Sequence, residues 1–229
     1  MNLELARELE ARVIEATEDR SAAVLVLASD GEIFCSGGDV AAMSRADSPS
    51  EYVRELAGVM HAALLRIARS DLLLVSAIQG AAAGAGLGLV LNSDVAVAAE
   101  EATFLSAYSA VGLSPDCGVS FLLPRTVGRL RASDVVMGAV RLNAATALEW
   151  GLISRVVARE ALLDAAMETA ERTARIPAPA RAVSKRLLQG ATLAAYAAHL
   201  DNERDSIAML SDSPESIALR ARFLDRSAR

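Results

Sequence analysis

The sequence predicts an α/β protein with a partly parallel sheet, and three features of the chain lead to this prediction. Residues 23–28 and 73–78 are continuous apolar runs, with the length and composition of strands buried on both faces. A helical pattern precedes the first run, and another lies between the two runs. Helix, buried strand and helix in succession are typical of the units that build parallel sheets.

The first half of the chain supplies the predicted sheet. Apolar side chains recur at near-helical spacing in residues 2–18, which predicts an amphipathic helix. The elements expected after it are, in order, a strand at 23–28, a glycine-rich turn at 29–39, a polar and mobile segment at 40–50, a helix at 51–69, strands at 73–78 and 95–99, and a further segment at 104–115.

The chain after Pro115 is predicted to be mainly helical, with Pro177 and Pro179 at the clearest breaks. The expected helices are 119–127, 131–140, 144–150, 160–175, 178–189, 192–209 and 214–225, with a short or edge strand at 153–157. We therefore divide the chain into an α/β core, residues 1–159, and a helical C-terminal region, residues 160–229.

Composition and charge limit the classes of function. Hydrophobic residues make up 53% of the 229 residues but aromatic residues only 3%, so the core is expected to consist largely of Ala, Val and Leu. A net charge of −6 without a Lys/Arg-dominated segment argues against nucleic acid as a partner. The charged N-terminal helix and the interrupted apolar runs predict neither a signal peptide nor a membrane span. Cys35 and Cys117 lack metal-ligand spacing, and we expect reduced thiols in a cytoplasmic protein.

Residues 81–88 form a run with almost no side chains beyond Ala. Gly84, Ala85 and Gly86 lie where a strand is expected to pass into a helix. Small residues there allow a ligand to approach the backbone, and the N–H groups at a helix start lack internal partners. Such a turn suits an oxygen that carries or develops negative charge. A tight packing turn explains the same residues, and on this segment alone the packing turn is the preferred interpretation.

Several segments together resemble the enoyl-CoA hydratase/isomerase (crotonase) family, and the resemblance covers nearly the whole chain in order. The segments are FCSGGD at 34–39, the run at 77–94, GLSP at 112–115 followed by LPR at 123–125 and Gly128, and ALEWGLI at 147–153. The resemblance implies a superhelix of ββα turns with a helical C-terminal region that mediates trimer formation. The opening pair of strands of that fold has no counterpart before residues 2–18, so either the protein lacks these strands or the recorded start of the sequence is too late.

The resemblance also implies an acyl-CoA thioester substrate whose enolate is stabilised by two backbone N–H groups, which by position belong to Gly38 and Ala85. Coenzyme A would enter as part of the substrate, without a metal or redox cofactor, and the assembly would be a homotrimer or hexamer. Other positions that would contact the substrate are Ser36 and Gly37 near the adenine side, Gly84 in the second turn, Tyr108 in the acyl pocket, Lys185 near the CoA phosphates and Phe223 near the adenine.

The acid–base residue is expected to be Asp116. The two glutamates of the hydratase subgroup fall by alignment on Gly88 and Tyr108, which argues against ordinary hydration. Asp116 follows GLSP, as in the isomerase subgroup that includes the ring-1,2-epoxyphenylacetyl-CoA isomerases. There an aspartate moves a proton between carbons of the acyl chain. The alternative structural interpretation is that Asp116 caps the helix beginning near Val119.

Three alternatives to the isomerase remain open. A hydratase-type lyase could use Asp116 and water, and a member without catalytic activity could only bind acyl-CoA. The 4-chlorobenzoyl-CoA dehalogenases place an aspartate nucleophile here and a histidine base at the position of Leu65, one helical turn after His61. His61 itself is expected to be a partly exposed helix residue, and no histidine is expected near Cys117. His199 is assigned no role.

Overall fold

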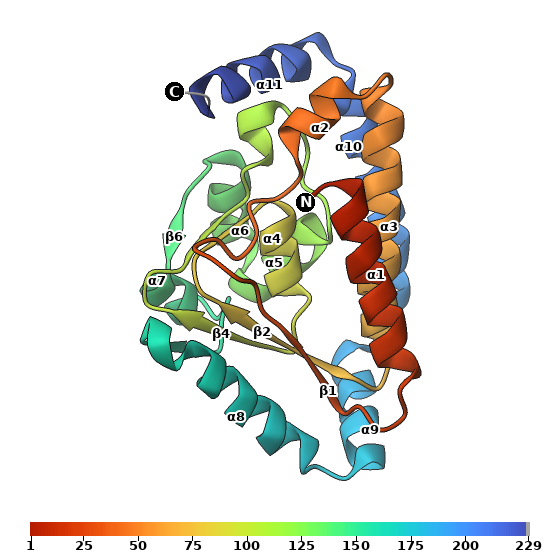
Figure 1. Ribbon diagram of the computed structural model, residues 1–229, viewed down its shortest axis with the longest axis vertical. Helices are drawn as coiled ribbons and strands as arrows, with labels where there is room; N and C mark the ends of the chain where they lie inside the picture. The colour runs from red at the N-terminus through yellow and green to blue at the C-terminus, as the bar shows by residue number, and fades with distance from the viewer. Residues whose placement is uncertain (228–229) are drawn as a thin grey trace.

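The computed structural model describes residues 1–227, and it confirms the predicted α/β architecture (Figure 1). The first sheet has four parallel strands in the order β1-β2-β4-β7. Its strands are β1 (Val24–Leu27), β2 (Leu73–Ile78), β4 (Val95–Ala99) and β7 (Arg155–Val157). The predicted apolar runs therefore lie side by side, and the short strand expected after residue 153 is the edge strand β7.

A second, smaller sheet continues directly from β2. It contains β3 (Ala81–Ala83), β5 (Thr103–Leu105) and β6 (Leu142–Asn143). β3 pairs with β5 in parallel, and β5 pairs with β6 in the antiparallel sense. Between the two sheets, the backbone of Gly80 passes so close to the carbonyl oxygen of Glu32 that a Cβ on Gly80 would overlap with it.

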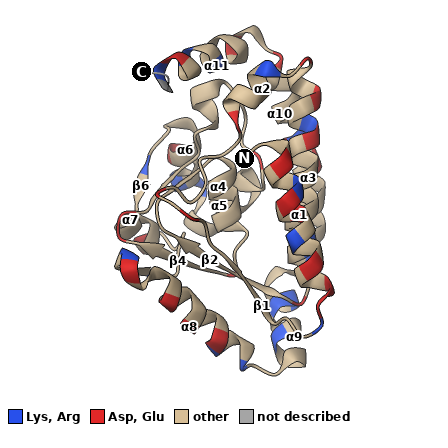
Figure 2. Cartoon of the chain, viewed as in Figure 1, with Lys and Arg blue, Asp and Glu red and all other residues tan. Residues whose placement is uncertain are grey.

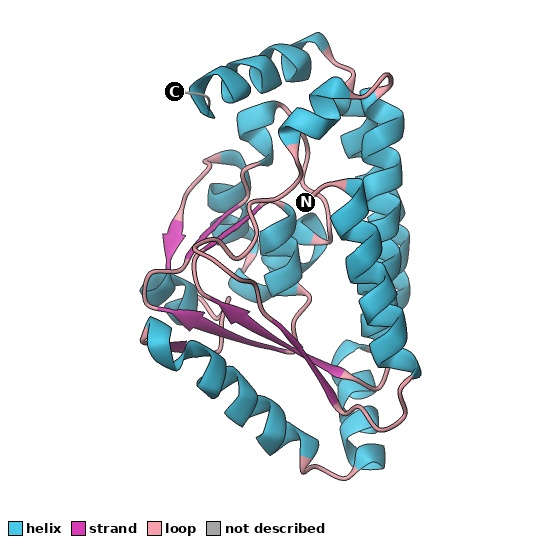
Figure 3. Cartoon of the chain, viewed as in Figure 1, coloured by secondary structure: helices cyan, strands magenta, loops and turns pink. Residues whose placement is uncertain are grey.

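Helices surround both sheets (Figure 3). They are α1 (Leu3–Glu18), α2 (Val40–Arg45), α3 (Pro49–Arg69), α4 (Ala85–Leu91), α5 (Val119–Val127), α6 (Arg129–Met137), α7 (Ala144–Glu149), α8 (Leu162–Ala174), α9 (Ala178–Gln189), α10 (Leu193–Ser211) and α11 (Pro214–Ser227), with short 3-10 helices η1 (Tyr108–Val111) and η2 (Arg159–Ala161). Figure 2 shows charges of both signs interspersed along α1, α3 and α8.

Alternate residues of β2 pack against helices on opposite faces of the sheet. Val75 and Ala77 belong to a buried cluster with Ala166 of α8. Leu74 points the other way and packs with Ala63 of α3 and Val13 of α1. Because both faces are covered, the central strand is apolar except for Ser76, whose buried hydroxyl is hydrogen-bonded to that of Ser93 at 2.6 Å.

The segment at 40–50 differs from the prediction of a polar, mobile loop. Residues Val40–Arg45 form α2, and α3 begins at Pro49. The side chain of Asp39 accepts a hydrogen bond from the N–H of Ala42, and Ser48 does the same for Glu51. These two caps explain why a polar segment forms helices here.

The proposed boundary at residue 159 stays a prediction. α8 begins three residues later and covers one face of the first sheet, so this part of the helical region packs as part of the core. Residues 228–229 of the predicted helical region lie outside the described residues. Among residues 1–227, no helix is both long and apolar enough to span a membrane. The homotrimer or hexamer also stays a prediction.

Candidate active site

A cavity of about 340 Å³ lies between α2, α3, η1 and the turns that precede α4 and α5. Eight of the predicted site residues line it: Ser36, Gly37, Gly38, Gly84, Ala85, Tyr108, Asp116 and Phe223. Most of its remaining wall is apolar and includes Val40, Met43, Val53, Leu56, Met60 and Ile207. Segments that lie far apart in the chain thus converge on one mainly hydrophobic space.

Two glycine turns bring backbone N–H groups to this cavity. Gly37 and Gly84 have φ values of +91° and +55°, which favour glycine. A Cβ on Gly37 would lie 3.0 Å from the carbonyl oxygen of Ala83, so the two turns pack backbone against backbone. The N–H groups of Gly38 and Ala85, the residues that follow, have no hydrogen-bond acceptor among residues 1–227. Two unpaired donors therefore border the same cavity.

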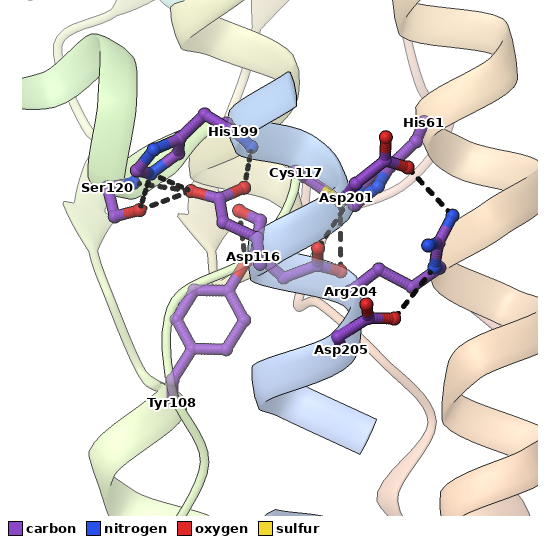
Figure 4. A network of polar contacts seen from close by, with 12 residues as sticks. His61, Tyr108, Asp116, Cys117, Ser120, His199, Asp201, Arg204 and Asp205 are labelled. Atoms are coloured by element: carbon purple, nitrogen blue, oxygen red, sulfur yellow. Dashed lines mark hydrogen bonds and ion pairs between the residues drawn. The ribbon is translucent and has the colours of Figure 1, made fainter. Parts of the chain in front are cut away.

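Asp116 lies in a tight turn before α5, and two side chains donate hydrogen bonds to the backbone carbonyl oxygens of this turn. The Tyr108 hydroxyl donates to the carbonyl oxygen of Asp116 at 3.0 Å (Figure 4), and the Asn92 amide donates to the carbonyl oxygen of Cys117 at 3.1 Å. Cys117 has a φ of +55°, which is unusual for a residue with a side chain. The alternative role of Asp116 as a helix cap is wrong, because α5 has Gly118 at its N-cap and no side-chain cap on that residue.

His61 was expected to be partly exposed, and this prediction is wrong. Its side chain on α3 is buried, and its Nε2 lies 2.5 Å from Oδ1 of Asp116. Nδ1 is also buried and has no partner among the described residues. A neutral ring whose Nε2–H donates to an Asp116 carboxylate leaves only a lone pair unpaired, whereas an imidazolium would leave a buried N–H unpaired. The geometry therefore favours a neutral His61 and an ionised Asp116.

Cys117 also has a histidine nearby, contrary to the prediction. Ligand atoms of His61, Asp116 and Cys117 all lie within 4.8 Å of one another, so this trio is the place where a metal ion could be held. The Cys117 thiol donates to Oδ2 of Asp116 at 3.6 Å. Burial, followed by the charges of Asp116 and Glu203, raises the pKa of Cys117 well above its usual value. The thiol is therefore a poor nucleophile at neutral pH.

Gly88, on the face of α4 next to the Asp116 turn, has no room for a side chain. A Cβ there would lie 2.6 Å from Cβ of Cys117 and 2.8 Å from the Cys117 carbonyl oxygen. Tyr108 fills the other position at which a hydratase glutamate was expected. Burial raises the pKa of Tyr108 well above its usual value, so its hydroxyl stays protonated.

The structure does not support the predicted contact of Lys185 with CoA phosphates. Lys185 is buried away from the cavity, and its ammonium group donates to the carbonyl oxygens of Ile67 and Leu72. The carboxylate of Asp94 lies 3.3 Å from this ammonium and accepts a hydrogen bond from the N–H of Leu74. Burial lowers the pKa of Lys185, while Asp94 opposes that shift. These contacts of Lys185 hold α9 against the core.

Sequence reasoning missed a second polar group behind the Asp116 turn. Glu203 of α10 is buried and accepts hydrogen bonds from the N–H groups of Gly118 and Ser120. The Ser120 hydroxyl also lies 2.8 Å from Nε2 of His199, and Figure 4 shows these two side chains together. Nothing in the helical pattern at 192–209 distinguishes Glu203 from its exposed neighbours. The contact of Glu203 with Gly118 and Ser120 joins segments that are far apart in the chain, and no local sequence motif predicts it.

Comparisons with known proteins find relatives over nearly the whole chain. The family model described as Enoyl-CoA hydratase/isomerase matches residues 1–225. The chain is 33% identical over 208 residues to 1,2-epoxyphenylacetyl-CoA isomerase of Escherichia coli strain K12, which covers 89% of this chain and 79% of that relative. It is 34% identical over 173 residues to 4-chlorobenzoyl coenzyme A dehalogenase-1 of Arthrobacter sp, which covers 75% of this chain and 63% of the dehalogenase.

The fold has equally extensive matches among solved structures. The crystal structure of an enoyl-CoA hydratase from Mycobacterium avium subsp. paratuberculosis K-10 matches 99% of this chain with a TM-score of 0.88 and 28% sequence identity. The match covers 87% of that chain. The sheets, the surrounding helices and the C-terminal helices described above are therefore shared with a known acyl-CoA enzyme fold.

Proposed function

This chain belongs to the enoyl-CoA hydratase/isomerase family, with the family's α/β fold and C-terminal helices, and we propose that it is an enoyl-CoA isomerase that uses Asp116. One observation carries the proposal: Asp116 is the one carboxylate among the described residues that line the cavity. The unpaired N–H groups of Gly38 and Ala85 border the same space. A single base and two oxyanion donors are sufficient for moving a double bond.

The proposed reaction transfers one proton and needs no other reactant. The Asp116 carboxylate removes a proton from the carbon next to the thioester carbonyl of a 3-enoyl-CoA. The electron pair spreads over the double bond and the carbonyl, and the N–H groups of Gly38 and Ala85 hold the resulting dienolate oxygen. The protonated Asp116 then returns the proton two carbons further along, which leaves a 2-enoyl-CoA and restores the carboxylate.

His61 fits this mechanism as the residue that orients Asp116. It does not itself line the cavity, so it acts through Asp116 instead of on the substrate. Its bond engages Oδ1, which leaves Oδ2, beside the Cys117 thiol, as the oxygen for proton transfer. Holding the carboxylate in one rotamer lowers the cost of reaching the reactive geometry.

Solvent deuterium exchange tests the proposed function. We expect the protein to introduce deuterium from D₂O into a bound 3-enoyl-CoA and to form the 2-enoyl-CoA, both followed by mass spectrometry. Hydration to a 3-hydroxyacyl-CoA as the main product would instead favour the hydratase-type alternative. Measurable ester binding with neither exchange nor product would favour a family member that binds acyl-CoA without catalysis.

A second candidate function follows from the contact between His61 and Asp116. The dehalogenase relatives suggest a reaction in which Asp116 attacks the ring carbon of a 4-chlorobenzoyl-CoA, displaces chloride and forms an aryl ester. Water would then attack the ester carbonyl of Asp116, which releases the hydroxylated product and restores the carboxylate; in this reaction the His61 ring would have to turn from Asp116 toward the cavity to accept the proton of that water. Chloride release from 4-chlorobenzoyl-CoA, measured beside the deuterium assay, distinguishes this reaction from isomerisation.

The apolar wall leads to a prediction about the acyl group. Apart from Asp116, no charged side chain lines the described cavity, and the ammonium group of Met1, a lining residue, is already bonded to the carbonyl oxygen of Gly37. A charged acyl terminus would therefore be desolvated without a side chain to pair with. We therefore expect a hydrocarbon 3-enoyl-CoA to have a kcat/KM at least about tenfold higher than that of an equally long chain ending in a carboxylate, since a penalty of about 1.4 kcal/mol is sufficient for that ratio. Competition between the two esters in one assay gives the ratio directly, and equal values would contradict the prediction.

A further inference from the structure

We propose that Glu203 is a positioning residue for Asp116, and this inference rests on the proposed role of Asp116 as the base. Glu203 lies on α10, far from Asp116 in the sequence. Its Oε2 accepts from the N–H of Gly118 at 2.6 Å, and its Oε1 accepts from the N–H of Ser120 at 3.0 Å. The Ser120 hydroxyl donates to the same Oε1 at 2.5 Å. One carboxylate thus binds the backbone on the C-terminal side of the catalytic turn.

These bonds supply a cap that α5 cannot make for itself. The first N–H groups of any helix lack partners within the helix, and Gly118 at the N-cap has no side chain to accept from them. Glu203 takes that role from a neighbouring helix. Burial raises the pKa of Glu203, and the hydrogen bonds from Ser120 and Gly118 oppose the shift. The three hydrogen-bond donors compensate for the free-energy cost of removing the Glu203 carboxylate from water.

The turn needs such support because its backbone is strained. Cys117 has its left-handed φ between Asp116 and Gly118, a conformation that persists only where the surroundings impose it. Tyr108 and Asn92 hold the carbonyl oxygens of Asp116 and Cys117, as described above. Glu203 is the one carboxylate bonded to the backbone of this turn among the described residues, and it engages the N–H that follows Cys117 directly.

The same helix also borders the substrate. Ile207, four residues after Glu203 and therefore on the same face of α10, lines the cavity. One face of α10 therefore carries both Glu203, which binds the turn that contains Asp116, and Ile207, which forms part of the wall of the acyl pocket. A change in the position of α10 would move Asp116 relative to the bound chain.

Glu203→Gln tests the proposal with little change in shape. Either orientation of the amide leaves one of the two backbone N–H groups facing an NH₂ donor, so one bond to the turn is lost. We expect kcat for isomerisation to fall between about ten- and a hundredfold, with KM changed much less, because a displaced base affects the chemical step more than binding. His199→Ala is the matched control, since it removes a neighbour of Ser120 and leaves both backbone bonds to Glu203 in place. We expect wild-type kcat from it.

A readout that does not depend on activity accompanies the kinetics. Amide hydrogen exchange at Gly118 and Ser120 is expected to be faster in Glu203→Gln than in wild type, and unchanged in His199→Ala. If Glu203→Gln does not fold, Glu203→Asp, which keeps the charge and withdraws it by one methylene, is expected to lower kcat in the same way. Wild-type kcat and exchange in a folded Glu203 variant would overturn the proposal. An inactive wild type would contradict the proposed function, and amide exchange would still decide whether Glu203 holds the turn.

Discussion

Asp116→Asn is expected to abolish deuterium exchange into a bound 3-enoyl-CoA, with a fall in rate of at least ~10²-fold. The amide has nearly the size of the carboxylate and its oxygen can still accept from Nε2 of His61, so the turn keeps its shape. It cannot take a proton from carbon, however. Binding of the thioester, which depends on the apolar wall and the two backbone donors, should therefore be nearly intact in a calorimetric titration.

Asp39→Asn is the matched control for this experiment. Asp39 is half-buried, caps α2 and does not line the cavity, and Asn is an equally good capping residue. Its exchange rate should equal that of wild type. If Asp116→Asn retained wild-type exchange, the base would have to be another group and the proposed mechanism would be wrong.

Gly88→Ala is expected to destabilise the protein by about 1–3 kcal/mol, although alanine is normally the better helix residue. The new Cβ would lie 2.6 Å from Cβ of Cys117, and the nearby Cys117 carbonyl oxygen belongs to the backbone and cannot turn away. The turn has to shift, and Asp116 shifts with it. We expect lower stability in urea unfolding together with a reduced exchange rate.

Gly58→Ala provides the comparison for that prediction. Gly58 lies within α3, and a Cβ there would meet nothing within 4 Å. This substitution is expected to leave stability unchanged or to raise it by about 0.4–1 kcal/mol, because it restricts the unfolded chain. Equal effects of the two substitutions would show that the space around Gly88 is larger than the structure indicates.

The elements of the fold were predictable because their signals are local. The runs at 73–78 and 95–99 became β2 and β4 with their predicted limits, and most helices differ from the prediction by a few residues at their ends. The strand-to-helix turn at Gly84 was also visible, because its lack of side chains is a property of adjacent residues. These features depend on neighbours in the sequence.

The contacts around Asp116 were not predictable in the same way. His61 is buried because α3 packs between α1 and α10, which its own helical pattern does not reveal. Glu203 meets Gly118 only after α10 has folded back onto α5. Lys185 was assigned to a phosphate only because of its position in the family resemblance, and its partners Ile67, Leu72 and Asp94 lie in other segments. In each case the partner comes from a distant segment, and a single sequence does not indicate which distant residues will be in contact.

Lys185 has a practical value that follows from its enclosure. It is the one lysine in a chain that otherwise carries its positive side-chain charge on arginine, and it is 3% exposed. A reagent that acylates primary amines therefore meets no accessible lysine side chain while α9 is docked. Acylation of Lys185, as distinct from acylation of the Met1 amine, would report each time α9 leaves the core, so the chain contains a single lysine that reports local opening.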